Sequence, residues 1–598
     1  MQPDAVLVHP NYAPEVAKRT GQEVASWPSA VDPIAKDWSS LSGKAVAVMT
    51  LGLEARQAED LAASVRKGGA ATVVVLHKEG KGDTPQPRPT PQEQKPAAPV
   101  QIIPGELPRV VDDCEALLLR SDLPAEQRIF QRGGQLVRVA VLPAPGLVGG
   151  VDRPAGAAII VPADVTFLRD LLGRIGLFEK FDRRSNQWVM ADLPKPAAEV
   201  LLARKGLWKL PLLRGVIACP TLRPDGSLLT APGYDQASGY FLADGLSVKV
   251  TDAPTREEAT AALEALRGLL DGFSFVSGVD QAVALALVLT AVARPALDST
   301  PIINVSAPVR GSGKSTLVDI AAVLAMGRRC AVLSATGNSD ELEKRIVGCL
   351  LSGDAMVSLD NLNGQLASDL LCQASTAEAV KLRPLGASPQ VEIENTTMWT
   401  ANGNNLVMSG DLSRRALVCR LDPGVEKPEE RTFSFDPVAR ARENRAAYVG
   451  HVLTVLRGYI AAGRPNIDLT PFGSFERWSS LVRSALVWAG AADPCESRES
   501  VMDEDPELAR LRALLVAWYE RFGRTPQNVK EVLRAVQGEE DTDLATAVEE
   551  VATDRRGRVT GQSLGLWLRR NMGRISAGLK LQRFSGSQGV ANWQVLEI

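Results

Sequence analysis

Apolar runs alternate with helix-like segments through the middle of the chain. One run covers residues 302–305, and the segment 315–327 that follows it has a helical pattern. A second run ends at Asp360, and a third, within 396–405, ends in side-chain amides. Strands that alternate with helices predict an α/β unit. The pattern at 436–500, later in the chain, predicts further helices.

The N-terminal pattern predicts a second, smaller α/β unit. Apolar runs at 5–8, 44–49 and 71–76 predict strands, and the segment 54–69 predicts a helix that ends at a Gly-Gly pair. Residues 79–101 are rich in Pro, Gln and charge and lack apolar periodicity. Such a composition predicts an extended, largely disordered tether.

The remaining segments complete the division of the chain. Residues 256–273 predict an amphipathic helix, 558–575 predict another helix, and 579–598 predict two strands joined by a Gly/Ser turn. A chain of 598 residues is long enough for several domains. We expect a multidomain α/β protein divided at 1–78, 79–101, 102–270, 271–500 and 501–598.

Composition and charge restrict the class of protein. The chain has 67 basic and 70 acidic side chains, which argues against a wholly basic nucleic-acid binder and leaves room for a local basic face. Its seven cysteines are scattered without a CxxC pair, so we expect no structural zinc site and a reducing compartment. We also find no apolar run of about 18 residues and no signal peptide, and therefore expect a cytoplasmic protein.

The loop after the first apolar run has the features of a phosphate-binding loop. The usual pattern is a glycine, four residues and Gly-Lys-Ser/Thr, and here Pro308 replaces the first glycine. The amides that cradle phosphate come later in the loop, so we expect Pro308 to be tolerated. The expected cofactors are ATP and Mg²⁺. The residues predicted to bind them are Gly311, Ser312, Gly313, Lys314, Ser315 and Thr316.

Polar side chains at the ends of the other predicted strands extend this candidate site. Asp360 is placed to hold Mg²⁺ through water, in the manner of a Walker B aspartate. Asn361 follows it, where many such ATPases place the catalytic glutamate, so the general base is not identified. Asn404 is a candidate for orienting the attacking water. Arg414 and Arg415 precede a fourth apolar run and are both candidates for an arginine finger.

The order "GSGKST", "MVSLDN", "TANGNN", "GDLSRRALVCRLDPGVEKPEER" resembles the ATPase domain of replication proteins from phages, plasmids and other mobile elements. These are primase-associated helicases similar to superfamily III within the AAA+ class, and the resemblance covers about residues 275–490. It implies a homo-hexameric ring that translocates on DNA, with an arginine that acts on the neighbouring subunit's nucleotide. For residues 102–270 it implies a collar or oligomerisation domain.

Two basic regions are candidates for contact with DNA. The segment "VKLRPLG", a turn and "VEIEN" resemble the pore hairpin of superfamily III helicases, with Lys381 and Arg383 as the contacting residues. An ordinary surface hairpin is the alternative. Residues 551–598 carry eight basic side chains and two acidic ones and resemble a winged-helix domain, with Arg569, Arg570 and Arg574 as phosphate contacts. A charged, solvated helix in a packing domain is the alternative there.

The N-terminal unit is similar to the Toprim domain of primases in this family. Toprim chemistry needs a glutamate and an Asp-x-Asp pair around Mg²⁺, and the matching positions here are His9, Leu51 and Leu53. This resemblance implies a degenerate domain without primer synthesis, which serves for assembly or for docking of a separate primase or other replication protein. An unrelated small α/β domain is the alternative.

Two functions from different classes are compatible with these features. The first is an ATP-dependent ring helicase for replication of a mobile genetic element, with primase activity lost. The second is an ATP-regulated initiator, scaffold or helicase loader that binds DNA without unwinding it. The missing glutamate after Asp360 keeps this second hypothesis open.

Overall fold

The structure is a computed structural model of the chain. It describes residues 5–8, 24–26, 45–49, 72–76, 98–120, 122–148, 151–153, 156–243, 245–334, 339–383, 390–431, 434–503, 505–537, 543–553, 557–585 and 591–598. The chain divides into two compact units, Met1–Ala98 and Pro99–Ile598. Most of the predicted tether at 79–101 lies outside the described residues.

The N-terminal unit contains a parallel sheet with the strand order β2-β1-β3-β4. Its strands are β1 (Ala5–Val8), β2 (Val24–Ser26), β3 (Ala45–Met49) and β4 (Thr72–Leu76). Three of them match the apolar runs, and β2 was not predicted. The expected helix at 54–69 and the Toprim positions His9, Leu51 and Leu53 lie outside the described residues. The Toprim assignment therefore stays a prediction.

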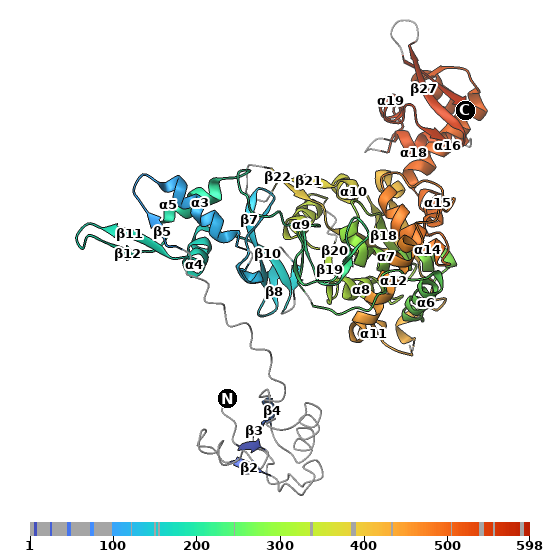
Figure 1. Ribbon diagram of the computed structural model, residues 1–598. Coiled ribbons are helices and arrows are strands. Elements are labelled where there is room, and N and C mark those ends of the chain that lie inside the picture. The colour runs from blue at the N-terminus through green and yellow to red at the C-terminus, as the bar shows by residue number, and fades with distance from the viewer. Residues whose placement is uncertain are drawn as a thin grey trace. The chain divides into compact units, whose positions relative to one another are not determined.

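The first part of the second unit, up to residue 243, is built from small sheets and short helices (Figure 1). The helices are α3 (Leu107–Leu118), α4 (Val165–Ile175) and α5 (Lys195–Ala203), with a 3-10 turn η3 (Ala125–Gln127). The strands are β5 (Val100–Ile102), β6 (Phe130–Arg132), β7 (Gln135–Val141), β8 (Gly146–Val148), β9 (Val151–Arg153), β10 (Ala158–Pro162), β11 (Phe178–Asp182), β12 (Gln187–Met190), β13 (Gly215–Ile217), β14 (Thr221–Leu222), β15 (Leu228–Leu229), β16 (Gly233–Tyr234) and β17 (Tyr240–Leu242).

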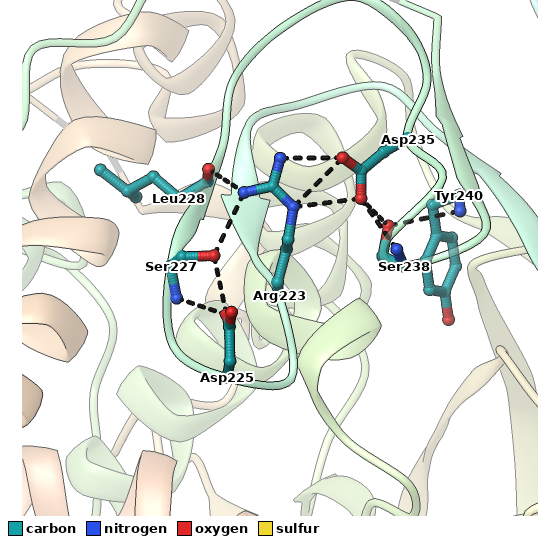
Figure 2. Close-up of polar contacts among 7 residues, drawn as sticks. All are labelled: Arg223, Asp225, Ser227, Leu228, Asp235, Ser238 and Tyr240. Carbon is teal, nitrogen blue, oxygen red and sulfur yellow. Dashed lines mark hydrogen bonds and ion pairs between the residues drawn. The ribbon is translucent and has the colours of Figure 1, made fainter.

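Arg223 holds the turns between β14 and β17 together (Figure 2). Its Nη2 donates to Asp235 Oδ1 at 2.8 Å and its Nη1 donates to the carbonyl of Leu228 at 2.6 Å. Asp235 Oδ2 also accepts from the backbone N–H and the hydroxyl of Ser238, at 2.9 and 2.6 Å. The hydrogen bond from Arg223 lowers the pKa of Asp235 to about 2. This segment is ordered by one charge-assisted network.

The second part of the unit is a five-stranded parallel sheet in the order β19-β20-β23-β18-β24, with helices on both faces (Figure 1). Ile303 and Val305 of β18 pack into one core with α7, α8 and α12. Ile302 packs into a second core with α9 and α10. Alternate side chains point to opposite faces of a strand, so a sheet covered on both sides needs continuous apolar runs. The predicted α/β class is confirmed.

The strands of this part are β18 (Ile302–Ala307), β19 (Ala331–Ser334), β20 (Met356–Leu366), β21 (Ala379–Leu382), β22 (Val391–Glu394), β23 (Met398–Met408) and β24 (Ala416–Arg420). The longer helices are α6 (Arg256–Leu269), α7 (Gly278–Ala293), α8 (Lys314–Met326), α9 (Ser339–Ser352), α10 (Asp369–Thr376), α11 (Pro437–Glu443), α12 (Arg445–Ala461) and α15 (Ser497–Asp503). The short helical segments are η4 (Arg294–Ala296), η5 (Gly410–Arg415), η6 (Pro428–Glu430), α13 (Glu476–Trp478), η7 (Ser479–Arg483), α14 (Ser484–Trp488) and η8 (Pro494–Glu496).

Two helices in this part bear on the sequence expectations. The helix expected at 256–273 is present as α6 and shares a core with α7, α8 and α12. The expected domain division at residue 270 stays a prediction. The span Gly278–Ala296 is long and apolar enough to cross a membrane, contrary to our expectation of no such run, but 89% of its apolar window is buried within the protein. Its buried residues belong to the core shared with α8 and α12. The assignment to the cytoplasm stays a prediction.

The C-terminal part has its own apolar core, which includes Trp518 and Trp593. Its helices are α16 (Pro506–Phe522), α17 (Val529–Val536), α18 (Asp543–Ala552) and α19 (Gly561–Arg570). Its strands are β25 (Gln527–Asn528), β26 (Ile575–Ser576), β27 (Leu579–Ser585) and β28 (Ala591–Glu597), in the order β25-β28-β27-β26. The helix and two strands expected after residue 558 are present.

The Arg223 network gives a first prediction. Asp235→Asn should lower the free energy of unfolding by about 2 kcal/mol, because the carboxylate pKa lies well below its unfolded value. A lowered acid pKa stabilises the fold above the unfolded pKa, near 4, and this contribution is lost as the pH falls towards 2. Urea unfolding at several pH values measures the difference. Asp252→Asn, at an exposed position, is the matched control, and equal effects of the two variants would contradict the assignment.

Candidate functional site

The loop between β18 and α8 has the backbone geometry of a phosphate cradle. Gly311 and Gly313 have φ values of +74° and +90°, a region that side chains other than glycine rarely adopt. A Cβ atom on Gly313 would lie 3.0 Å from Phe273, and one on Gly311 would lie 3.1 Å from Glu429 Oε2. Helix α8 begins at Lys314, so the positive end of its dipole faces this loop.

Lys314 points back over the loop toward the neighbouring strand β23. Its ammonium donates to the carbonyl of Val309 and to Asn404 Oδ1, both at 2.9 Å. Burial lowers the pKa of Lys314, and the negative charge of Asp360 partly opposes this shift. The structure thus brings together Lys314, Asn404 and Asp360, which the sequence singled out from three separate segments.

Ser315 forms the second contact point between the loop and the sheet. Its hydroxyl donates to Asp360 Oδ2 at 3.1 Å and accepts from Asn402 Nδ2 at 3.1 Å. Asn402 is buried on β23, and its Oδ1 accepts from the hydroxyl of Ser358 on β20 at 3.3 Å. No role was predicted for Asn402. Its signal was an amide side chain that follows apolar residues within a predicted strand, where a buried polar group must find a partner.

Two strands continue beyond the residues at which they were expected to end. Strand β20 runs on from Asp360 to Leu366, and β23 runs past Asn404 to Met408. The register of β20 against β23 shifts between Leu359 and Leu362, which is the mark of a bulge. Asn361 occupies this bulge with φ +58°, and its N–H donates to Asp360 Oδ1 at 2.6 Å. The bulge lets Asp360 face the phosphate loop without ending the strand.

These side chains open into a pocket of about 720 Å³. Lys314, Ser315, Asp360, Asn361 and Asn404 line it together with the loop residues 310–313. Two aromatic side chains, Phe273 and Phe435, and three charged ones, Asp271, Arg431 and Asp436, also line it. These last five residues were not predicted from the sequence. A pocket that combines polar groups suited to phosphate with aromatic side chains suits a nucleotide.

The oxygen ligands available for a metal are few. Within the part of the chain that the structure describes, no three His, Cys, Asp or Glu side chains come close enough to hold a metal ion. Ser315 and Asp360 provide two adjacent oxygen donors at the phosphate end. Mg²⁺ takes six oxygen ligands and often draws most of them from water and phosphate. The donor set therefore fits Mg²⁺ brought with a nucleotide and does not fit a resident ion.

The structure separates the two candidate finger arginines. Arg415 is only 17% exposed and is bound within its own chain, to the carbonyl of Cys372 at 2.9 Å, to Thr376 Oγ1 at 2.5 Å and to Asp411 Oδ2 at 2.7 Å. Arg414 is 62% exposed, and its ion pair with Asp411 lies at the surface. Arg415 is therefore part of the packing, and Arg414 is the one that can reach another molecule.

The candidate DNA-contacting residues lie on two other elements. Lys381 is exposed on the β21–β22 hairpin, 4.0 Å from Glu392 on the opposite strand, and Arg383 is exposed where β21 has ended. The turn at 384–389 lies outside the described residues. Arg569 and Arg570 are exposed at the end of α19, and Arg574, also exposed, donates to Asn571 Oδ1 at 2.8 Å. None of these five belongs to the lining of the pocket that contains Lys314.

Comparisons with known proteins add little to this geometry. No protein-family model and no curated protein matches the chain. A solved structure titled the apo form of the NrS-1 C-terminal region covers 72% of this chain and 100% of its own, with 14% identity and a TM-score of 0.31. One titled SCCmec type IV Cch, active helicase, covers 80% and 98%, with 11% identity and a TM-score of 0.30. A small-molecule complex of JCV helicase covers 39% and 68%, with 14% identity and a TM-score of 0.19. TM-scores this low carry no argument about fold or function.

The contrast between the two arginines gives a second prediction. Arg415→Ala should lower the free energy of unfolding by about 1–3 kcal/mol. The change removes the donor from the carbonyl of Cys372, from the hydroxyl oxygen of Thr376 and from the carboxylate of Asp411. Arg414→Ala should change it by less than about 1 kcal/mol, since its ion pair is exposed. Thermal unfolding of the two variants measures both losses of stability. A larger loss for Arg414→Ala than for Arg415→Ala would contradict the assignment of Arg415 to packing.

Proposed function

We propose that this protein is an ATP-driven helicase that translocates on DNA as a homo-hexameric ring and replicates a mobile genetic element. The observation that carries the proposal is the convergence of Lys314, Ser315, Asp360 and Asn404 in one nucleotide-sized pocket. This is the arrangement that phosphoryl transfer needs, since catalysis there consists mainly of positioning and electrostatic stabilisation.

Each of these residues has a role in the proposed hydrolysis. The N–H groups at the start of α8 and the ammonium of Lys314 bind the phosphate oxygens, which replace the present acceptors Val309 and Asn404. Ser315 directly and Asp360 through water would hold Mg²⁺, which would neutralise charge on the phosphates. Once Lys314 moves to phosphate, the side chain of Asn404 is released to orient the attacking water.

The catalytic glutamate is the missing part of this site. An amide such as Asn361 cannot accept a proton, and its left-handed backbone holds it beside Asp360. This observation favours a second candidate function, an initiator, scaffold or helicase loader in which ATP binding controls assembly and turnover is slow. The same pocket serves both functions, and only the rate of hydrolysis and its coupling to DNA separate them.

The proposed contacts with other molecules follow from exposure and charge. Arg414 acts in trans on the nucleotide of the adjacent subunit. Lys381 and Arg383 line the ring's pore, and the C-terminal domain is a winged helix that binds phosphates through Arg569, Arg570 and Arg574. The N-terminal unit is a degenerate Toprim domain that docks a separate primase or another replication protein and makes no primers.

Hydrolysis and unwinding give the test of the proposed function. The wild-type protein should hydrolyse ATP, faster with single-stranded DNA, and should unwind a forked duplex. Lys314→Ala should lower the turnover rate by about 10²-fold or more, because it removes the cation from the phosphates. Hydrolysis without unwinding would favour the assembly function. Both candidate functions would be overturned if the wild-type protein showed no hydrolysis and bound nucleotide no better than the Lys314→Ala variant.

The role of Arg414 in trans is tested by mixing variants. Arg414→Ala should lower turnover by about 10³-fold while nucleotide affinity stays close to wild type, because a finger acts mainly on the transition state. Subunits with Arg414→Ala keep a complete phosphate loop, and subunits with Lys314→Ala keep the finger. A mixture of the two should therefore regain part of the activity that each lacks alone. Two inactive variants that stay inactive when mixed would show that Arg414 does not act across an interface.

A further inference from the structure

The hairpin formed by β11 and β12 exposes three large apolar side chains. Phe181, Trp188 and Met190 are 46%, 37% and 61% exposed. Phe181 lies directly opposite Trp188, and Met190 lies opposite Glu179, so all four side chains share one face of the hairpin. The two rings meet edge to face, with their centroids 5.6 Å apart.

The other face of the same hairpin packs only at its base, since Lys180 and Gln187 on that face are exposed. Phe178 is 2% exposed and belongs to the core formed with α3, α4 and α5. In Figure 1 the hairpin extends outward from α4. The aromatic face does not take part in that core. Its two rings pack against each other and remain exposed. Exposed apolar patches of this kind often mark binding sites.

The turn of the hairpin places cations beside these rings. Arg183 and Arg184 are exposed, and neither forms an ion pair with any carboxylate in the described part of the chain. The acid next to them, Asp182, is engaged locally, since it accepts from the N–H of Arg184 at 3.1 Å and from the hydroxyl of Ser185 at 2.8 Å. The nearby Arg174, by contrast, is paired with Asp170 at 2.8 Å.

We propose that this hairpin binds single-stranded DNA, with bases stacked on Phe181 and Trp188 and phosphates held by Arg183 and Arg184. Base stacking on exposed aromatic rings next to cations is the usual way in which proteins hold single strands without reading their sequence. The proposal rests on the proposed function only in taking DNA as the ligand. It adds a contact outside the pore hairpin and outside the C-terminal domain.

The alternative occupant of this aromatic face is a second copy of the chain. The exposed apolar area is small for such an interface. A stable protein interface buries about 800 Å² on each partner, whereas three partly exposed side chains offer on the order of a few hundred. A single strand needs only one ring face for each base. The free arginines also match a polyanion better than an apolar partner. Size and charge therefore both favour single-stranded DNA.

Photo-crosslinking tests the site directly in the full-length protein. An oligo-dT strand that carries 5-iododeoxyuridine should crosslink to a peptide containing Phe181 or Trp188, and unlabelled single strands should compete better than duplex. Mass spectrometry identifies the peptide. Crosslinks confined to other parts of the chain would overturn the proposal.

Affinity measurements with matched controls provide the second readout. Phe181→Leu with Trp188→Leu should weaken binding of oligo-dT roughly tenfold, and Arg183→Gln with Arg184→Gln should lower the salt-dependence slope by about 1.4. The controls Leu207→Ala and Arg174→Gln change an exposed apolar residue and a paired arginine of the same region. They should leave binding unchanged.

The outcomes separate this proposal from the proposed function. The hairpin variants should keep the hydrolysis measured without DNA, because the hairpin contributes nothing to the lining of the nucleotide pocket. A change of oligomeric state in the leucine variant, with DNA affinity intact, would assign the face to a second copy and overturn the DNA proposal. Crosslinking does not depend on ATP, so a protein without hydrolysis can still confirm the hairpin contact.

Discussion

The contact of Ser315 with both Asp360 and Asn402 is the interaction on which the candidate site depends. It joins the first turn of α8 to two neighbouring strands, β20 and β23, at the edge of a parallel sheet where loops and helix N-termini meet. Crevices outside the carboxyl ends of parallel strands are the usual binding places of such folds. The short distances within this contact and around Lys314 place a hydroxyl, a carboxylate and an ammonium within reach of one phosphate chain.

Buried arginines connect this sheet to the rest of its unit. Arg132 on β6 donates to the carbonyls of Leu350 and Leu351, at the end of α9. Arg445 donates to the carbonyl of Ala218 at 2.6 Å and to that of Leu324 at 3.1 Å, which joins the segment before β14 to the end of α8. The last carbonyls of a helix lack partners within it, so a guanidinium satisfies them and complements the dipole. Movements of α8 and α9 are thereby tied to residues 130–218.

The sequence predicted the elements of the central sheet better than their limits. Local patterns of apolar residues gave β18, α8 and the strand of Asp360, because each depends on neighbours along the chain. The predicted ends of β20 and β23 were wrong. Both strands are longer, because a bulge at Asn361 and pairing between strands distant in sequence extend them. Asn402 was missed for the same reason. Its partner, Ser315, is far away in sequence and close only after the strands align.

By itself, the sequence determined the phosphate-loop motif, the α/β class and the set of polar residues from which a nucleotide site could be built. These follow from spacing and periodicity, which act over a few residues. Only the tertiary structure decided which polar residues meet, that Arg415 is packed while Arg414 is exposed, and that Phe181 and Trp188 face outward. Burial depends on which surfaces the folded chain covers. Two adjacent arginines of identical chemistry can therefore differ completely in what they reach.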